Sequence, residues 1–397
     1  MTPRTFGRYE ILRPIASGGM ATVYLGRALG LGGFQRLIAV KVMHPHYAAE
    51  ADFVSMFLDE ARLAASIRHP NVVATLDVES GPEGLYIVME YVEGPPLNAL
   101  IKAARQKGGR LPVPIALRVV LDTLAGLHAA HELTAPDGQP LRLVHRDVSP
   151  HNVLVGVDGI SRITDFGVAR AESRLVSTRD ATVKGKVPYM PPEQLGGMVV
   201  DRRADVYAVG VVLWELLTGE RMIRGEDPGA ILAAAMRGPP AAPVDFAPGV
   251  PPALSDVCMR ALLPHEQRWA TAAEFADALE SAAAFDHVNP ASPRAVGALA
   301  KTVAPPPAQL PAAPTAVLPS SDRSSPSGPQ PGSNPSQPSH VSQSAQHGPV
   351  SEPVQASSFA GATGPFVQSG TTAVPIQQTV APPAPRRWPQ AVVFAVA

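Results

Sequence analysis

Two aspartates, Asp147 and Asp165, are the strongest candidates for chemistry in this sequence. Both lie in the stretch from Val144 to Gly167, each in a loop next to a short apolar run. The runs, 153–155 and 161–164, are separated by glycines and an aspartate, which is typical of a tight hairpin. Each acid therefore lies in a loop at the end of a predicted strand. Catalytic and binding residues are often found in such loops, because the rigid strands hold the loops in position.

The order of residues around these acids resembles the catalytic and metal-binding loops of the bacterial eukaryotic-like (Hanks-type) protein kinases. Asp147 ends a His-Arg-Asp triplet, Asn152 follows it by five residues, and Asp165 begins an Asp-Phe-Gly triplet eighteen residues after Asp147. The resemblance implies that Asp147 accepts the proton of a substrate hydroxyl, while Asn152 and Asp165 hold Mg²⁺ on the phosphates of ATP. The alternative is that both acids only cap loops, and the joint spacing favours the kinase interpretation.

A lysine and a glutamate upstream form a second predicted constellation. Lys41 lies in an apolar strand, and Glu60 lies on the otherwise apolar face of a predicted helix over 51–67. An unpaired carboxylate in such a stripe costs several kcal/mol of desolvation, so Glu60 needs a cation, and Lys41 is the obvious partner. The family resemblance implies this ion pair, with Lys41 also reaching the α- and β-phosphates of ATP. The alternative is that both side chains lie on the surface.

The first predicted hairpin resembles the glycine-rich loop that covers the phosphates in kinases, with two departures. Ala16 and Ala21 replace the first and third glycines, whereas Gly18 survives and is followed by Gly19. Small side chains still allow the backbone to approach a polyphosphate, and the glycine pair predicts positive φ angles in the turn.

By the same resemblance, the ATP site includes residues from both sides of the adenine ring. Met89 would guard the back of the pocket, while the Glu90 carbonyl and the Val92 amide would bond the adenine edge. The remaining expected contacts are Ile15, Val23, Ala39 and Leu154. The implied cofactors are ATP and Mg²⁺.

Composition limits the possible partners and the compartment. The chain has 397 residues with 33 basic and 34 acidic side chains, so no electrostatic footprint indicates a nucleic-acid partner. The single cysteine, Cys258, excludes an internal disulfide and is expected to be a buried apolar side chain in a reducing compartment. The N-terminus lacks the apolar segment of a secretory signal, so we expect the folded part to be cytoplasmic.

The periodicity predicts a mostly β part followed by a mostly α part over residues 9–284, and by resemblance to the family this layout implies the α+β, bilobal protein-kinase fold. Residues 9–92 contain five predicted strands and one helix, and residues 96–284 follow a helical period after a Gly-Pro-Pro connector. Asp205 begins an apolar helix and by resemblance hydrogen-bonds the backbone of the catalytic loop. Arg268 is expected to pair with Glu193, again in a structural role.

The C-terminal part has a different composition. Residues 285–397 contain 21 of the 44 prolines, and residues 285–385 are predicted to be a disordered Pro/Ser/Ala-rich linker. Arg386 and Arg387 precede a short apolar run, so residues 386–397 are expected to be a juxtamembrane segment and the start of a truncated transmembrane helix. The alternative is a short apolar end on a soluble kinase.

The segment from Gly167 to Glu193 contains candidate regulatory sites. Arg146 in the family receives a phosphate from the activation loop, and the hydroxyl side chains of that segment are Ser173, Ser177, Thr178 and Thr182. Thr178 is the first choice and Thr182 the second. Self-association of kinase domains would allow one domain to phosphorylate this segment of another. The alternative is that these Ser and Thr side chains are ordinary polar loop residues that are not phosphorylated.

Two further departures from the family bear on activity. Ser149 occupies the place, two residues after Asp147, where most Ser/Thr kinases have a lysine that neutralises the transferred phosphate. Lys186 occupies the place of a threonine that contacts that lysine and the catalytic aspartate. We hypothesise that Lys186 supplies the missing charge, with its ammonium within about 2.7 to 4 Å of Asp147 or Ser149. The alternative is a solvent-facing lysine in a pseudokinase.

The sequence as a whole therefore predicts a Ser/Thr protein kinase that resembles membrane-linked members of the myxobacterial type. Its expected activity is transfer of the ATP γ-phosphate to Ser or Thr of proteins in signal transduction. Two alternatives stay open. One is a pseudokinase that binds ATP or acts as a scaffold, and the other is a small-molecule kinase of the same broad fold.

Overall fold

A computed structural model of the protein describes residues 4–30, 33–48, 50–82, 84–166, 186–225 and 227–304. The side chains of Met56, Glu60 and Pro228 also lie outside the described part. All described residues belong to the first of two units into which the chain divides, Met1–Pro319.

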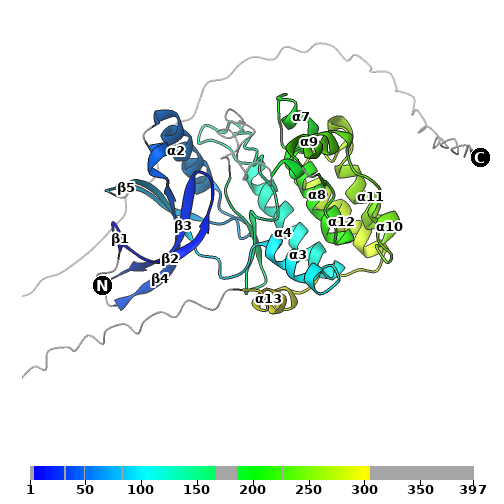
Figure 1. Cartoon of the computed structure of the whole chain (residues 1–397), viewed down its shortest axis with the longest axis horizontal. Coiled ribbons are helices and arrows are strands. Elements are labelled where there is room, and N and C mark those ends of the chain that lie inside the picture. The colour runs from blue at the N-terminus through cyan, green and yellow to red at the C-terminus, as the bar shows by residue number, and fades with distance from the viewer. Residues whose placement is uncertain are drawn as a thin grey trace, which may run out of the picture. The chain divides into compact units, whose positions relative to one another are not determined.

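The N-terminal lobe is an antiparallel sheet of six strands in the order β1-β2-β3-β4-β6-β5 (Figure 1). The strands are β1 (Thr5–Phe6), β2 (Tyr9–Ser17), β3 (Ala21–Leu29), β4 (Gln35–Met43), β5 (Thr75–Gly81) and β6 (Gly84–Glu90). The five predicted strands are confirmed, and the two-residue β1 is an addition. The single predicted helix is two helices, the short α1 (Pro45–Ala48) and α2 (Ala51–Ser66).

The strand register divides the sheet into two faces. Val23 pairs with Lys41, and Ala39 pairs with Met89. Because alternate residues of a strand point to the same side, these four residues share one face. The opposite face carries an apolar cluster of its own, formed by Phe6, Tyr9, Ile38, Val40, Val42, Tyr86 and Val88. One face is thus filled with apolar side chains, while the other presents Lys41.

The second lobe is mainly helical and is built around α8 (Arg203–Thr218). The other helices of the described part are α3 (Leu97–Gln106), α4 (Val113–His131), α7 (Pro192–Leu195), α9 (Pro228–Arg237), α10 (Pro243–Phe246), α11 (Pro252–Ala261), α12 (Ala272–Phe285) and α13 (Pro293–Lys301), with 3₁₀ turns η2 (Val187–Tyr189) and η3 (His265–Gln267). Every residue of α8 after Arg203 is buried, which confirms the predicted central helix. Cys258 on α11 is fully buried against α8, as expected.

One helix in the described part, α4, is long and apolar enough to cross a membrane. Most of its apolar window, 61%, is buried inside the protein, where it packs against α8 and α12. In this structure α4 is therefore a core helix of the second lobe.

A small hairpin joins the two lobes. It consists of β7 (Val153–Val155) and β8 (Ser161–Ile163), the two predicted runs. The Val155 and Val157 amides donate to the carbonyls of Pro95 and Glu93 in the connector, at 2.9 and 2.8 Å. Ile163 exchanges hydrogen bonds with residues 71–73 of the first lobe. The connector approaches the hairpin closely at Gly94, where a Cβ would lie 2.0 Å from the Val155 carbonyl oxygen.

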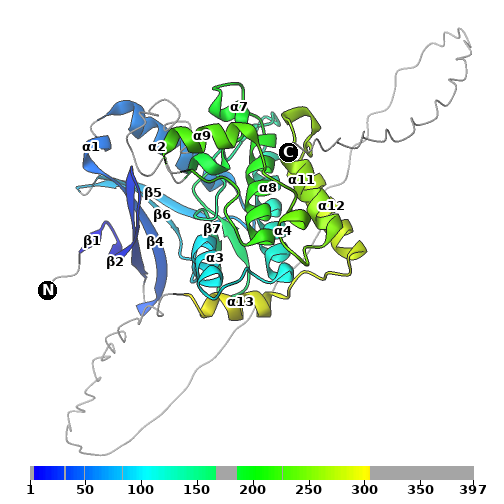
Figure 2. The ribbon, with the colours of Figure 1, turned by 45° about the vertical axis from the view of Figure 1, so that its right-hand side comes forward.

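The folded part extends beyond the predicted boundary at residue 284. Helix α13 lies against β7 and α4 (Figure 2, yellow), with Val296 and Ala300 fully buried in the main core. The prediction of a disordered linker was therefore wrong for residues 293–301. Ser292 caps the helix by accepting the Ala295 amide, and the small residue Gly297 allows close contact with Val157. The predicted linker from residue 305 on and the predicted transmembrane segment lie outside the described residues.

Candidate active site

The catalytic segment around Asp147 has no regular secondary structure and is held by α8. The buried carboxylate of Asp205 accepts hydrogen bonds from the backbone amides of His145 and Arg146, both at 2.8 Å, and contacts His131 Nε2 at 2.7 Å. Burial alone would raise the pKa of Asp205, but these hydrogen bonds and the neighbouring histidines hold its pKa below the usual value. The structural role predicted for Asp205 is confirmed.

Three of the predicted catalytic residues meet at one carboxylate. Asn152 Nδ2 donates to the backbone oxygen and to Oδ2 of Asp147, both at 2.8 Å. Lys186 Nζ lies 2.9 Å from the same Oδ2. The predicted distance between Lys186 and Asp147 is thus confirmed.

Ser149 stands where most Ser/Thr kinases have lysine, and its carbonyl accepts the Asn152 amide at 3.0 Å. Its side chain is buried, and its hydroxyl has no hydrogen-bond partner among the described residues. Position 149 thus carries no ammonium group. The ammonium that contacts Asp147 belongs instead to Lys186, 37 residues further along the chain.

The second acid, Asp165, lies across the cleft and binds Lys41. Lys41 Nζ donates to Asp165 Oδ1 at 2.8 Å, a contact that links β4 of the first lobe to the metal loop. Burial favours a raised pKa for Asp165, but Lys41, Lys186 and His145 together keep its pKa below the usual value. The contact between Lys41 and Asp165 was not predicted. The predicted partner of Lys41, the side chain of Glu60, lies outside the described residues, so that ion pair stays a prediction.

The backbone at both motifs is in an unusual conformation. Arg146 has φ 64° and Asp165 has φ 63°, in the left-handed region that non-glycine residues rarely occupy. Such positions are costly and gather at functional sites. Arg146 directly precedes Asp147, and Asp165 is itself a predicted metal ligand.

His145 connects the two loops and was missed as a positioning residue. Its Nδ1 accepts the Asp147 amide at 3.2 Å, so Nε2 carries the proton donated to the Thr164 carbonyl at 2.9 Å. Its ring also packs against Phe166, with centroids 4.6 Å apart. The sequence signal for this role was the histidine of the His-Arg-Asp triplet, because its ring can donate a hydrogen bond to the loop that carries the Asp-Phe-Gly triplet.

The expected adenine contacts come from opposite sides of the cleft. Val23, Ala39 and Met89 lie on the sheet face that carries Lys41, and Met89 borders a cavity of about 20 Å³ together with Asp165. Leu154 lies on the hairpin of the second lobe, where it forms a bridge with Pro96.

The remaining predicted nucleotide contacts lie on the connector and on the first hairpin. The Glu90 carboxylate lies 3.9 Å from Arg162, Val92 is buried, and Ile15 is 38% exposed at a register shift between β2 and β3. The turn closes through a hydrogen bond of 2.9 Å from the Gly18 amide to the Ala21 carbonyl. A positive φ was expected at the glycine pair, and this was wrong for Gly18, because the turn closes without it.

The donor set suits magnesium. The Asn152 amide nitrogen is bonded to Asp147, which leaves its side-chain oxygen as a possible ligand. Asp165 supplies an ionised carboxylate of depressed pKa. Mg²⁺ in phosphate-transfer sites is usually held by one or two such groups together with phosphates and water. These two residues therefore fit the predicted metal site, while no cluster of three or more His, Cys, Asp or Glu suited to a metal occurs among the described residues.

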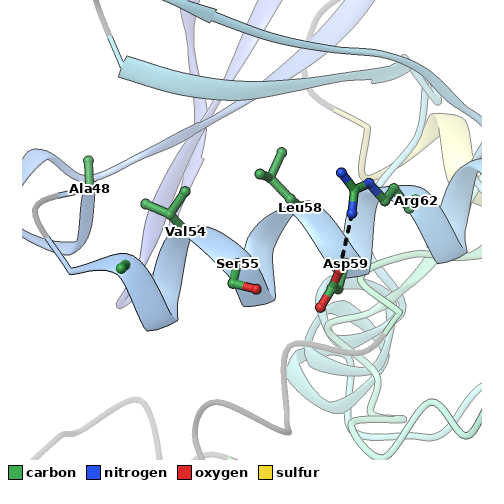
Figure 3. A pocket seen from close by; sticks show the side chains of 7 residues that line it. Ala48, Val54, Ser55, Leu58, Asp59 and Arg62 are labelled. Atoms are coloured by element: carbon green, nitrogen blue, oxygen red, sulfur yellow. Dashed lines mark ion pairs between the residues drawn. The ribbon is translucent and has the colours of Figure 1, made fainter.

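A larger hollow lies elsewhere, along α2 and the end of α1 (Figure 3). Its volume is about 510 Å³, and its side chains include Val54, Leu58 and an ion pair of 3.6 Å between Asp59 and Arg62. None of the predicted catalytic or nucleotide-binding residues lines it.

Two other predictions concern the segment that follows Asp165. The candidate phosphorylation sites Ser173, Ser177, Thr178 and Thr182 lie outside the described residues. At the end of the segment, Arg268 forms two hydrogen bonds with the Glu193 carboxylate, at 2.5 and 3.0 Å. This buried pair confirms the predicted structural role of both residues.

Comparison with known proteins agrees with this geometry. The sequence profile of the protein kinase domain matches residues 9–265. The chain belongs to the protein kinase family. It is 43% identical over 297 residues to the tyrosine-protein kinase MasK of Myxococcus xanthus, which covers 75% of this chain and 46% of MasK. It is 34% identical to the serine/threonine-protein kinase PrkC of Bacillus subtilis over 287 residues, 72% of this chain and 42% of PrkC.

Solved structures show the same fold. The crystal structure of the kinase domain of PknI from Mycobacterium tuberculosis superposes with a TM-score of 0.54 at 29% identity. The match covers 72% of this chain and 99% of the PknI structure. The predicted bilobal α+β fold and the resemblance to bacterial eukaryotic-like kinases are confirmed. The chain spans less than half the length of the curated relatives MasK and PrkC.

Proposed function

We propose that this chain transfers the γ-phosphate of ATP to Ser or Thr hydroxyls of proteins as part of signal transduction. The observation that carries the proposal is the meeting of Lys186 and Asn152 at the Asp147 carboxylate. That carboxylate is 5% exposed and is held on a loop that α8 fixes through Asp205. A buried, oriented carboxylate next to a cation is suited to accept a proton from a hydroxyl while negative charge develops beside it.

Each residue of the site has a distinct role in this proposal. Asp147 accepts the proton of the acceptor hydroxyl, and Asn152 orients that carboxylate. Lys186 supplies positive charge next to the transferred phosphate, in place of the lysine absent at Ser149. Lys41 and Asp165 approach from the other side, for the α- and β-phosphates and for magnesium. Bound Mg²⁺ would neutralise the phosphate oxygens.

The pseudokinase alternative rests on the departures at Ala16, Ala21 and Ser149. The contact of Lys186 with Asp147 weighs against it, because a charge is present where the family needs one. Small residues also keep the first hairpin compatible with a nearby polyphosphate.

The acceptor amino acid is a separate question. Most of the bacterial relatives are named serine/threonine kinases, whereas MasK is named a tyrosine kinase. Incubation of the purified chain with radiolabelled ATP and a general protein acceptor, followed by phosphoamino acid analysis, decides it. We expect phosphoserine and phosphothreonine. Phosphotyrosine alone would replace the Ser/Thr proposal with the tyrosine one, and the absence of all three would favour the pseudokinase.

Two further proposals concern regulation and location. A phosphate on Thr178, or next on Thr182, would pair with Arg146, and kinase domains would associate to add it in trans. The basic pair at 386–387 and the apolar run after it would anchor the protein at the cytoplasmic side of a membrane. Mass spectrometry showing an unmodified loop in active enzyme would contradict the first. Recovery of the natural full-length protein only in the soluble fraction would contradict the second.

A further inference from the structure

A third cavity, of about 440 Å³, lies directly beside the catalytic segment. Pro150 and His151 of that segment form one wall, and residues of α3 form another. Tyr189 of η2 and Arg221, just after α8, complete it. The cavity shares no lining residue with the small cavity at Lys41 and Asp165, so it is separate from the predicted nucleotide site.

Three cations surround this cavity: Lys102, Arg105 and Arg221. Among the residues that the structure describes, the side chains of Lys102 and Arg221 form no hydrogen bond or ion pair. Arg105 donates from Nε to the Gly219 carbonyl at 2.5 Å, but its Nη2 is buried without a partner. Arg105 therefore adds a third positive charge to the lining, and no carboxylate of the described residues forms an ion pair with it.

The one carboxylate in the lining, Glu215, does not neutralise these cations by direct contact. Its Oε2 accepts the Tyr189 hydroxyl at 3.1 Å, and its Oε1 accepts the Met222 amide at 3.3 Å. Burial raises the pKa of Glu215, while the charges of Arg221 and Arg105 act in the opposite direction. The neutral Asn98 has one buried unpaired oxygen, which changes no charge. The excess charge of the lining is positive.

The cavity is close enough to Asp147 to contact the same substrate segment. His151 follows Asp147 by four residues, and the charges of both Asp147 and Lys186 act on its imidazole. Tyr189 follows Lys186 by three residues. An extended peptide advances about 3.3 Å per residue, so residues a few positions from a hydroxyl at Asp147 would reach this cavity.

We infer that this cavity is a specificity site that binds an acidic side chain of the protein substrate, close in sequence to the phosphorylated residue. The inference rests on the proposed function and names the substrate class. The shared chemistry is an anion, either the carboxylate of Asp or Glu or the phosphate of an already phosphorylated residue. An arginine at the same substrate position would meet three cations and would be disfavoured.

A peptide series tests the inference. Each peptide carries one acceptor Thr, and Asp, phosphoserine, Ala or Arg is placed in turn at positions up to about five residues on either side. At one or two neighbouring positions we expect Asp to raise kcat/KM about tenfold over Ala, and Arg to lower it. A phosphoserine stronger than Asp would identify a previously phosphorylated substrate as the source of the anion, and the reverse order would identify a carboxylate.

Charge reversal assigns the effect to the cavity. Lys102→Glu combined with Arg221→Glu should remove the preference for Asp or turn it into a preference for Arg. The matched control is Lys107→Glu with Arg224→Glu, since these two exposed cations lie near the same segments but do not line the cavity. The control should keep the preference of the unmodified chain.

Two results would overturn the inference while leaving the proposed function intact. They are equal transfer to the Asp, Ala and Arg peptides, or a preference that survives charge reversal in the cavity. Absence of transfer to every peptide and to a general protein acceptor would instead overturn the proposed function, and the specificity site with it.

Discussion

In the proposed function, Lys186 is the residue outside the shared motifs on which activity should depend most. Its ammonium lies 2.9 Å from Asp147, whereas the position that normally carries the lysine holds the buried Ser149. Phosphoryl transfer depends on positioning and charge stabilisation, so a relocated cation can do the work of the missing one.

Replacing Lys186 by alanine should therefore lower kcat by about a hundredfold and change KM for ATP much less. The reason is that the interaction strengthens as charge develops in the transition state. Steady-state kinetics of Lys186→Ala beside Lys107→Ala measures this, because Lys107 is an exposed lysine far from the motif in sequence. A Lys186→Ala enzyme with full kcat would contradict the role.

The exchange of positions can be tested in both directions. Ser149→Lys alone places two cations near one carboxylate, and Lys186→Thr alone leaves none. The double variant Ser149→Lys/Lys186→Thr restores the arrangement usual in the family, and we expect it to recover most of the activity lost in Lys186→Thr. An inactive double variant beside an active Lys186→Ala would show that the two positions do not substitute for each other.

Sequence reasoning at this scale correctly placed the ammonium of Lys186 beside Asp147. Ser149 and Lys186 each depart from a fixed place in the motif, and family geometry predicts that these places are neighbours. The contact of Lys41 with Asp165 could not be predicted, because it depends on where the metal loop lies relative to β4. Spacing along the chain gives no information on that placement.

At the scale of elements, the catalytic loop depends on its attachment to α8. The Asp205 carboxylate accepts two loop amides, and its pKa is held below the usual value despite burial. A lowered pKa in the folded state means that Asp205 stabilises the fold above its unfolded pKa of about 4. That stabilisation is lost as the pH falls through the folded-state pKa.

Asp205→Asn should accordingly reduce the free energy of unfolding by about 3 kcal/mol near pH 7. The difference from the unmodified chain should shrink as the pH falls below the usual aspartate range. Urea unfolding at several pH values measures both effects, with the exposed Asp137→Asn as a control expected to change stability by less than about 0.5 kcal/mol. An equal loss at every pH would contradict a role for the ionised carboxylate.

Helix α13 is the element that composition failed to predict. It lies in a region rich in Pro, Ser and Ala, where few apolar residues mark a periodic face. Its stability comes from contacts with a distant hairpin, since Val296 and Ala300 are fully buried and Gly159 lies directly under the Pro293 carbonyl. Local helix propensity does not reflect contacts with a segment that is distant in the sequence.

Two glycines with nearly equal backbone angles test this docking. Gly159 has φ 85° and a Cβ there would lie 1.8 Å from the Pro293 oxygen, whereas Gly138 has φ 81° and open space around it. Gly138→Ala should lower the free energy of unfolding only by the cost of placing alanine in the left-handed region, about 1 to 2 kcal/mol. Gly159→Ala should lower the free energy of unfolding by clearly more, because α13 must move to make room for the new Cβ.

Truncation before residue 292 provides the complementary measurement. In the truncated chain the excess cost of Gly159→Ala over Gly138→Ala should disappear, as read from urea midpoints. An excess that persists without α13 would show that the strain at Gly159 has another origin.

At the scale of the whole molecule, the sequence predicted the two lobes, the connector and the order of the motifs. These features follow from periodicity and from spacing, which a single sequence carries. The boundary at residue 284 was too early because a docked helix depends on tertiary contacts. The described part of the chain is thus a kinase domain to which α13 is docked, with a proposed site for an acidic substrate side chain beside its catalytic loop.

The most direct test of this account is transfer of labelled phosphate from ATP to a protein acceptor by the purified chain and by Asp147→Asn, with Asp137→Asn as the control. We predict transfer by the unmodified chain and by the control, and a reduction of about a hundredfold or more in Asp147→Asn with its fold intact. Equal turnover in Asp147→Asn, or no transfer by the unmodified chain under conditions in which it binds Mg-ATP, would contradict the account.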